Sequence, residues 1–209
     1  MGTSRKLSMI FGSDTIFPMG KAQVTSERRV AELALQVGRA VYGESSAAGL
    51  TPAQWMALRF FARANRFSRT ISAFADFHAT TRGTASQTVK SLVARGFLTR
   101  TRSARDGRSA TFDLTARGRR TLAADPFEAV VRAALQLSPA QRDRTASGLR
   151  GILRELAVER DRPAPALCSL CGHLSANGGQ GFTCRLMREP LSAAELEQLC
   201  VHCQQCRGT

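Results

Sequence analysis

The stretch from residue 82 to residue 118 most constrains the fold, because three different local signals follow one another there. Apolar residues recur at helical spacing from Arg82 to Arg95, and Gly96 stands where a left-handed residue ends a helix. Alternating residues then predict two strands on either side of Asp106-Gly107, a dipeptide typical of tight hairpin turns. Thr115 is a good N-cap for a following helix. This order predicts a helix, a β-hairpin and a second helix in direct succession.

Apolar periodicity predicts further helices on both sides of this unit. The expected helices run from Glu27 to about Glu44, from Thr51 onward, from Thr70 to Phe77, from Ala116 to about Leu137 and from Pro139 to about Glu159. The fourth of these should be kinked or divided at Asp125-Pro126, because proline interrupts helical hydrogen bonding. We therefore expect a helical domain over residues 27–160, preceded by an extension (1–26) and followed by a tail (161–209).

The residues around the hairpin resemble the MarR family of winged helix-turn-helix transcriptional regulators. The resemblance rests on three pieces: Gly96-Phe97-Leu98, Arg105-Asp106-Gly107-Arg108-Ser109 and Leu114-Thr115-x-x-Gly118. It covers about residues 28 to 158 and implies a mainly α fold with a winged helix-turn-helix head, a two-stranded wing and a helical dimerisation region. The Arg-rich loop from Ala64 to Thr70 and the extensions at both ends depart from the family's usual pattern.

Positive charge is concentrated in the same region. The net charge is +14, and the segment from Arg59 to Arg120 holds fourteen Lys and Arg residues against three acidic ones. A basic face of this kind is typical of proteins that bind a polyanion. We therefore expect double-stranded DNA as a partner, and the homodimer that the resemblance implies would read a palindromic operator.

The expected DNA contacts lie on the helix from Arg82 to Arg95 and on the wing. The N-terminal half of such a helix meets base edges in the major groove, so Ser86 and Gln87 are candidates for reading bases. Capping or simple exposure would explain Thr84 and Ser86 equally well. The wing arginines would reach the flanking minor groove, although an Asp106–Arg108 pair that only fixes the hairpin is an alternative. The complete candidate set is Arg82, Thr84, Ser86, Gln87, Lys90, Arg102, Arg105 and Arg108.

The sequence gives little support to a membrane protein or an enzyme. No apolar segment is long enough to span a bilayer, and the N-terminus does not resemble a signal peptide, so we expect a cytoplasmic location and no membrane partner. With three histidines, no Ser/His/Asp set and no phosphate-binding loop, the chain is poorly supplied for catalysis.

Six cysteines distinguish the tail: Cys168, Cys171, Cys184, Cys200, Cys203 and Cys206. In a reducing compartment, paired Cys-x2-Cys spacings indicate metal ligation rather than disulfides. We favour an iron–sulfur cluster because the triple run 200–206 resembles part of a cluster ligand set. Zinc is the alternative, since two Cys-x2-Cys pairs suffice for a tetrahedral site. Sensing by bare thiols is a third interpretation.

Within this tail we expect Cys168, Cys171, Cys184 and one or two of the last three cysteines to be the ligands. A helix from Ala193 to Leu199 would present Cys200 at its end. The histidines His173 and His202 are possible ligands, although surface or hydrogen-bonding roles are commoner for such residues.

These observations combine into one hypothesis: a sequence-specific regulator, expected to be a repressor, whose DNA affinity is controlled by the cluster or by redox state. Because the tail follows the last dimerisation helix, the cysteine site is expected beside those helices. One alternative is a regulator with a purely structural zinc site that responds to a small aromatic ligand or to thiol oxidation. Another is a general nucleic-acid binder with a zinc ribbon.

Overall fold

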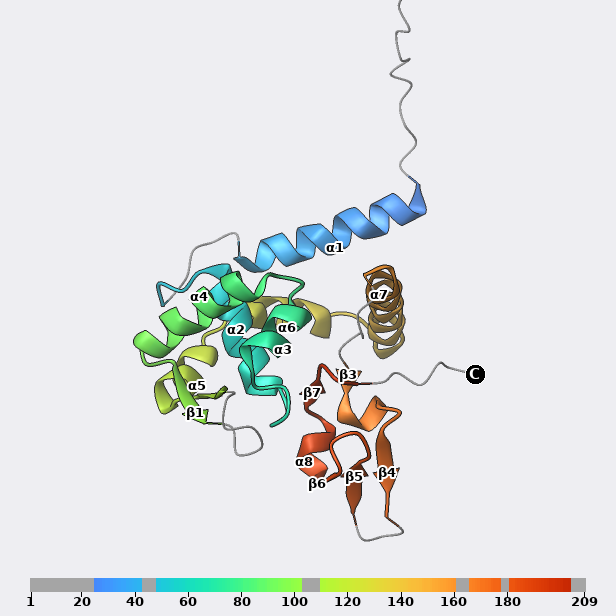
Figure 1. The fold of residues 1–209 in the computed structure, drawn as a ribbon. Coiled ribbons are helices and arrows are strands. Elements are labelled where there is room, and N and C mark those ends of the chain that lie inside the picture. Colours follow the sequence, from blue (N-terminus) through green and yellow to red (C-terminus); the bar gives the residue numbers. More distant parts are fainter. Residues whose placement is uncertain (1–24, 43–47, 103–109, 161–165, 178–180, 204–209) are drawn as a thin grey trace, which may run out of the picture. The chain divides into compact units, whose positions relative to one another are not determined.

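The helices and the hairpin expected from the sequence are present in the computed structural model (Figure 1), which describes residues 25–42, 48–102, 110–160, 166–177 and 181–203. Its helices are α1 (Ser26–Tyr42), α2 (Pro52–Arg63), α3 (Ile71–Phe77), α4 (Arg82–Ala94), α5 (Ala116–Leu122), α6 (Phe127–Leu135), α7 (Pro139–Glu159) and α8 (Ala193–Leu196). Its strands are β1 (Leu98–Arg102), β2 (Ala110–Leu114), β3 (Ala166–Leu167), β4 (Leu174–Ala176), β5 (Phe182–Cys184), β6 (Glu189–Leu191) and β7 (Leu199–Cys200).

Helix α2 supplies the centre of the core. It begins with a capping box, in which Thr51 and Gln54 satisfy each other's backbone amides, as the sequence predicts. Its largest buried side chains are Trp55, Phe60 and Phe61, each 2% exposed. These pack with residues of α3, α4 and the hairpin into one apolar cluster, and α2 contacts α3, α4, α5 and β2. The helix-turn-helix is therefore built against α2.

The hairpin follows α4 as predicted. Gly96 adopts a φ of 73° and ends the helix, and the next strand begins at Leu98. Strands β1 and β2 pair antiparallel, with Leu98 opposite Leu114 and Arg102 opposite Ala110. The Asp106-Gly107 turn lies outside the described residues. Both Leu98 and Leu114 are buried, so the base of the hairpin belongs to the core.

The predicted division at Asp125-Pro126 is confirmed, since α5 ends before it and α6 begins after it. Pro126 has no backbone N–H to continue the helical ladder. The buried Asp125 carboxylate instead accepts a hydrogen bond from the Phe127 amide and pairs with Arg59 of α2 at 3.3 Å. Burial lowers the pKa of Arg59, and the charge of Asp125 opposes that shift. This ion pair ties the break between the two helices to the core.

Helices α1 and α7 carry apolar residues that the described chain leaves exposed. Leu33 and Val37 of α1 are 54% and 51% exposed, in a unit that ends at Gly38 and is distinct from residues 39–209. In α7, Leu149, Ile152 and Leu153 lie on the apolar face that the sequence predicts, and all three are exposed. These faces lack the burial that amphipathic helices normally find within a domain.

The tail folds into two small sheets, which the sequence did not reveal. Strand β3 pairs with β7, and β4, β5 and β6 form a three-stranded antiparallel sheet, drawn in orange to red in Figure 1. The helix expected from Ala193 to Leu199 is wrong at its end. Helix α8 stops at Leu196, and Leu199 and Cys200 pair as a strand with β3. In the extended conformation, Leu199 and Cys200 pair with β3, and the Leu199 carbonyl also accepts the Asn65 amide.

Within the described ranges, none of the helices is both long and apolar enough to cross a membrane.

The close approach of α5 to the start of β1 gives a test of the fold. A Cβ added at the buried Gly118 would lie 2.2 Å from the carbonyl oxygen of Phe97, so Gly118→Ala forces the backbone to shift. We expect a loss of about 2 kcal/mol or more in unfolding free energy, measured by thermal or denaturant unfolding. Gly148→Ala on α7 is the control. It meets no atom within 4 Å and should be neutral or stabilising by up to about 1 kcal/mol. Equal stability of wild type and Gly118→Ala would contradict this packing.

Candidate nucleic-acid interface and cysteine site

Helix α4 presents one buried and one exposed face. Ala85, Val89 and Leu92 are completely buried against the core, as the sequence predicts. Most of the predicted DNA-contacting residues on this helix are exposed: Arg82, Thr84, Gln87 and Lys90. Ser86 is half-buried. The structure therefore places polar and basic side chains on the outer face of the helix, where a major groove could meet them.

Thr84 has a structural role in addition to its exposure. Thr81 is the N-cap of α4, and its hydroxyl accepts the Thr84 amide at 3.1 Å and lies 2.9 Å from the Thr84 hydroxyl. Capping therefore accounts for Thr84 without a DNA contact. The cap does not involve the side chains of the other three exposed candidates, which are Arg82, Gln87 and Lys90.

The turn between α3 and α4 contains a half-buried histidine. His78 packs among the rings of Phe60, Phe74 and Phe77, with centroid distances from 4.8 to 6.3 Å. Its Nε2 atom is buried and makes no hydrogen bond in the part of the chain that the structure describes. Burial lowers the pKa of His78 to about 4, a shift opposed by its hydrogen bond to the Met56 backbone and reinforced by Arg59.

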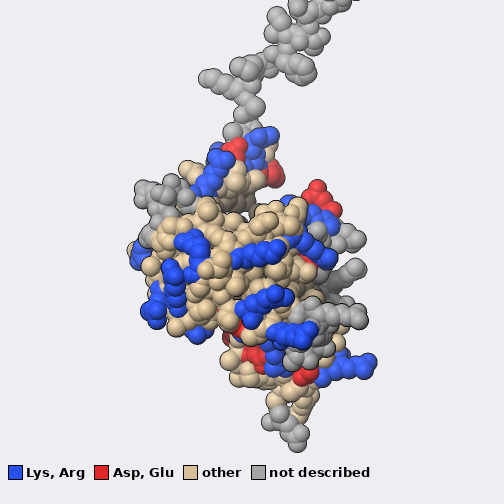
Figure 2. Space-filling view, turned by 60° about the vertical axis from the view of Figure 1, so that its left-hand side comes forward, with Lys and Arg blue, Asp and Glu red and all other residues tan. Residues whose placement is uncertain are grey.

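Exposed basic residues continue along the hairpin. Arg100 and Arg102 of β1 are exposed, and Figure 2 shows Lys and Arg spread over one face of the molecule with few Asp and Glu among them. Arg105 and Arg108 of the predicted wing tip lie outside the described residues. Part of the basic cluster serves the fold instead. Arg95 donates to the carbonyls of Ala48 and Gly49, and Arg117 donates to that of Arg95.

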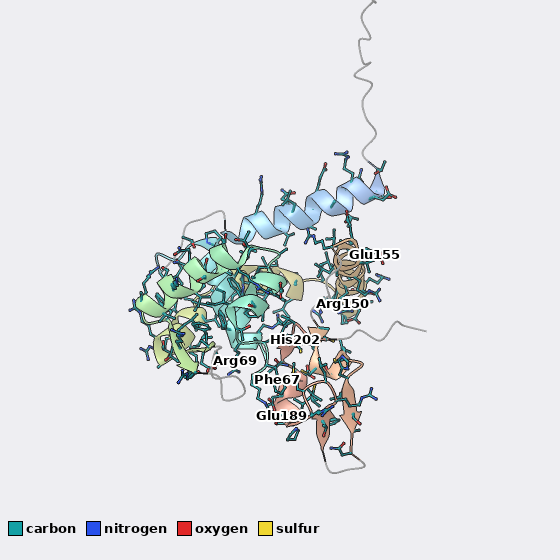
Figure 3. The ribbon with its side chains drawn as sticks, in the orientation of Figure 1. Phe67, Arg69, Arg150, Glu155, Glu189 and His202 are labelled. Atoms are coloured by element: carbon teal, nitrogen blue, oxygen red, sulfur yellow. The ribbon has the colours of Figure 1, made fainter. Side chains whose placement is uncertain are left out.

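The Arg-rich loop between α2 and α3, residues 64–70, contacts the tail. Arg66 forms ion pairs with Glu195 (2.9 Å) and Glu189 (3.7 Å) and donates a hydrogen bond to the Pro190 carbonyl. Figure 3 shows Phe67 and Glu189 at this junction, with His202 also nearby. The sequence marked this loop as unusual but did not indicate what it binds.

Five of the six predicted cysteine ligands are described, and none of these five forms a disulfide. Cys168, Cys200 and Cys203 are buried, and Cys171 and Cys184 are half-buried around the same apolar cluster. Four of the thiols line one hollow together with both candidate histidines: Cys168, Cys171, Cys184, Cys200, His173 and His202. Cys206 lies outside the described residues.

The hollow forms where a turn at Cys168 lies beside the paired strands β3 and β7. Cys168 begins a 3₁₀ turn, η1 (Cys168–Leu170), in which the Cys171 amide donates to the Cys168 carbonyl at 3.1 Å. Pairing of β3 with β7 brings Cys200 beside this turn, and Cys184 arrives on β5. Residues more than thirty positions apart thus surround one space.

Cys168 and Cys200 form a hydrogen-bonded pair. The hydrogen bond from Cys168 lowers the pKa of Cys200, and the same bond, followed by burial, raises the pKa of Cys168. The two thiols therefore titrate as one coupled pair, in which the thiolate is favoured at Cys200. Thiolates are the form in which cysteines bind thiophilic metals and attack oxidants.

The arrangement has the donor chemistry for a metal without showing a complete ligand set. Among the described residues, no three His, Cys, Asp or Glu side chains are grouped as metal ligands. The thiols nevertheless share one hollow, and a buried amide from Asn65 donates to the sulfur of Cys168 at 3.2 Å. Soft sulfur donors with such a hydrogen bond suit zinc or an iron–sulfur cluster.

Comparison with known proteins supports the DNA-binding part of this site. The MarR family model matches residues 48–109. The S. aureus MepR–DNA complex is 17% identical, with a TM-score of 0.54, and the match covers 65% of this chain and 99% of MepR. The transcriptional repressor CouR bound to a 23-mer DNA duplex is 27% identical, with a TM-score of 0.52, over 64% of this chain and 96% of CouR.

The transcriptional regulator SlyA is 20% identical, with a TM-score of 0.51, and the match covers 64% of this chain and 94% of SlyA. A search of curated proteins finds no match. The CouR and SlyA structures are of transcription regulators. The family match ends at residue 109, so it does not reach the cysteines.

Titration of His78 should make stability depend on pH. An unfolded chain takes up this proton near pH 6.5, but the folded chain does so only near pH 4. The stability contributed by neutral His78 is therefore complete above pH 6.5 and is lost as the pH falls toward 4, by up to about 3 kcal/mol. Denaturant unfolding at pH 7 and pH 5 should show this loss in wild type and a smaller loss in His78→Gln. As a control, His202→Gln changes an exposed histidine and should keep the wild-type loss of stability. If His78→Gln loses as much stability between pH 7 and pH 5 as wild type does, His78 is not the cause of the loss.

Proposed function

We propose that this protein is a dimeric, sequence-specific DNA-binding regulator of the MarR type whose cysteine module controls its DNA affinity. Residues 48–109 match the MarR family model. The observation that carries the DNA-binding part is the exposed polar and basic face of α4, directly followed by the basic strand β1. The match to CouR, a transcriptional repressor bound to a DNA duplex, supports action as a repressor.

The helix-turn-helix and the β1–β2 hairpin, here called the reading head, bind DNA through shape and charge. A helix exposed on one side fits the major groove, where Gln87 can form paired hydrogen bonds with an adenine edge. Arg82 and Lys90 lie on the same helix and supply charge for phosphates or guanine. The hairpin that follows α4 would meet the flanking minor groove, which attracts guanidinium groups when it is narrow.

A homodimer explains the exposed apolar faces of α1 and α7. Leu33, Val37 and Leu153 are each more than half exposed, and these helices lie outside the segment that matches the family model. Covering these residues with a second copy would remove apolar area from water, at roughly 25 cal/mol per Å². A two-fold dimer would present two α4 helices and so favour a palindromic operator.

Control of DNA affinity is assigned to the cysteine module because its thiols gather in one hollow that also touches the reading head. An iron–sulfur cluster held by Cys168, Cys171, Cys184 and Cys200, with Cys203 or Cys206 as further donors, is the favoured cofactor. Such a cluster would supply a redox-sensitive charge beside the loop. A zinc ion on the same thiols is the alternative, and it would make the module a structural clip. A regulator of this kind could still respond to a small aromatic ligand or to thiol oxidation.

The DNA-binding proposal is tested with a duplex selected by the wild-type protein from a random-sequence pool. Gln87→Ala should lose about tenfold or more in affinity for that duplex while binding competitor DNA normally. Lys90→Ala should weaken binding to both DNAs and lower the salt slope by about one. Arg144→Ala removes the same charge from α7 and serves as the control. The proposal fails if Gln87→Ala and Lys90→Ala bind the selected duplex as tightly as Arg144→Ala does.

The cofactor proposal is tested by analysing anaerobically purified protein. We expect visible absorption, iron and acid-labile sulfide, all of which should be lost in a Cys168→Ser/Cys200→Ser double variant. Ser169→Ala, a change in the same turn that leaves every thiol in place, should keep them. A colourless protein with about one zinc per chain would contradict the iron–sulfur cluster and support a purely structural zinc site.

A further inference from the structure

The loop between α2 and α3 connects the cysteine site to the wing. It departs from the family's usual pattern, and the proposed DNA contacts do not involve it. Three of its residues, Ala64, Asn65 and Ser68, are completely buried. A connecting loop with this degree of burial is unusual, because loops normally run over the surface.

One side of the loop is joined to the tail by backbone hydrogen bonds. Ala64 forms a parallel bridge with Leu199, and the Asn65 amide donates to the Leu199 carbonyl at 2.9 Å. Two residues further along the tail, the Val201 amide donates to the Ser68 hydroxyl at 3.1 Å. Leu199 and Val201 are themselves part of the winged-helix core. The strand that carries Cys200 is therefore held directly against the reading head.

The Asn65 side chain is the point at which the loop touches sulfur. Its Nδ2 donates to the Sγ of Cys168 at 3.2 Å, and its Oδ1 accepts the amides of Phe67 and Ser68 at 3.1 and 3.0 Å. Because Asn65 is buried, water cannot replace a partner that it loses. The same side chain thus sets the shape of the loop and depends on the sulfurs of Cys168 and Cys200 for its remaining hydrogen bonds.

The other end of the loop is joined to the hairpin. The Arg69 guanidinium pairs with Asp113 of β2, and its Nε donates to the Ala64 carbonyl at 3.0 Å. The Arg69 carbonyl accepts the Phe112 amide at 2.9 Å. Any change in the path of the loop is therefore passed to β2, and through its pairing with β1 to the wing.

We propose that Asn65 is a positioning residue that couples the state of the Cys168 sulfur to the placement of the wing and so to DNA affinity. This inference rests on the proposed function. A metal-bound thiolate is a strong acceptor for the Asn65 amide, whereas an unloaded, protonated thiol is a weaker one. Loading of the site with a thiophilic metal or cluster therefore holds the loop in the conformation that β2 requires. Stripping removes that restraint.

The variant Asn65→Asp removes the amide N–H that contacts the thiols of Cys168 and Cys200. It keeps the oxygen that accepts the Phe67 and Ser68 amides and removes the N–H that reaches Cys168. Arg66→Ala is the matched control from the same loop. It removes the ion pairs with Glu189 and Glu195 at the junction but leaves the contact with sulfur in place.

The experiment compares the affinity of the full-length protein for the selected duplex after anaerobic loading and after chelation. Separate samples are loaded with Fe²⁺ and sulfide or with Zn²⁺ alone. Wild type and Arg66→Ala should show a change of about tenfold between loaded and stripped protein. Asn65→Asp should bind the same amount of metal yet change by less than about twofold. A full wild-type response in Asn65→Asp would overturn the coupling and leave the proposed function intact.

A second measurement needs no variant. The Phe112 amide, which bonds to Arg69, should exchange its hydrogen more slowly in loaded than in stripped wild type. Equal exchange in the two states would overturn the inference even if Asn65→Asp fails to fold. If loading changes neither DNA affinity nor hydrogen exchange in wild type, the proposal that the cysteine module controls DNA affinity is wrong. The DNA-binding function is tested separately by the α4 variants Gln87→Ala and Lys90→Ala.

Discussion

Burial of the aromatic face of α2 is the constraint on which the rest of the reading head depends. Trp55, Phe60 and Phe61 are the large side chains around which α3, α4 and the hairpin assemble. Packing against these buried side chains sets the orientation of α4: its small and branched residues face inward and its polar residues face outward. Exposure of the candidate DNA contacts is thus a consequence of core packing rather than an independent feature.

The same core reaches into the tail. Leu199 and Val201 contribute to it, and the loop after α2 is hydrogen-bonded to the strand that carries Cys200. The proposed sensor and the proposed reading head therefore share side chains and backbone hydrogen bonds. Sequence reasoning placed the cysteine site beside the dimerisation helices, whereas the contacts seen are with the α2–α3 loop. Under the proposal, a change at the sulfur therefore has a short route to the hairpin, through one loop of seven residues (64–70).

The basic charge of residues 59–120 has two uses. Arg59, Arg66 and Arg69 form ion pairs with acidic residues of the chain, and Arg95 and Arg117 donate to backbone carbonyls and stack on Phe97. The exposed side chains of Arg82, Lys90 and Arg100, on α4 and β1, can meet a polyanion. Net charge alone overstates the DNA-binding surface, because it does not distinguish a guanidinium that caps a helix from one that faces solvent.

Local signals in the sequence were sufficient for the helices, their caps and the hairpin. Thr51 with Gln54, Gly96 and Asp125-Pro126 each act within a few residues, through hydrogen bonds or backbone geometry, so their effect can be read without the fold. The spacing of the cysteines likewise identified the tail as a distinct kind of module. Arg105, Arg108 and Cys206 remain predictions, because they lie outside the described residues.

Only the tertiary structure decided what joins the tail to the head. The pairing of β3 with β7, the end of α8 at Leu196 and the contact of Asn65 with Cys168 depend on residues far apart in the chain. No local pattern encodes them, because each hydrogen-bonding partner is supplied by a segment that packing alone brings near. The sequence by itself determined which residues form the helices, the hairpin and the group of thiols. Packing determined that the thiols and the hairpin contact the same buried loop.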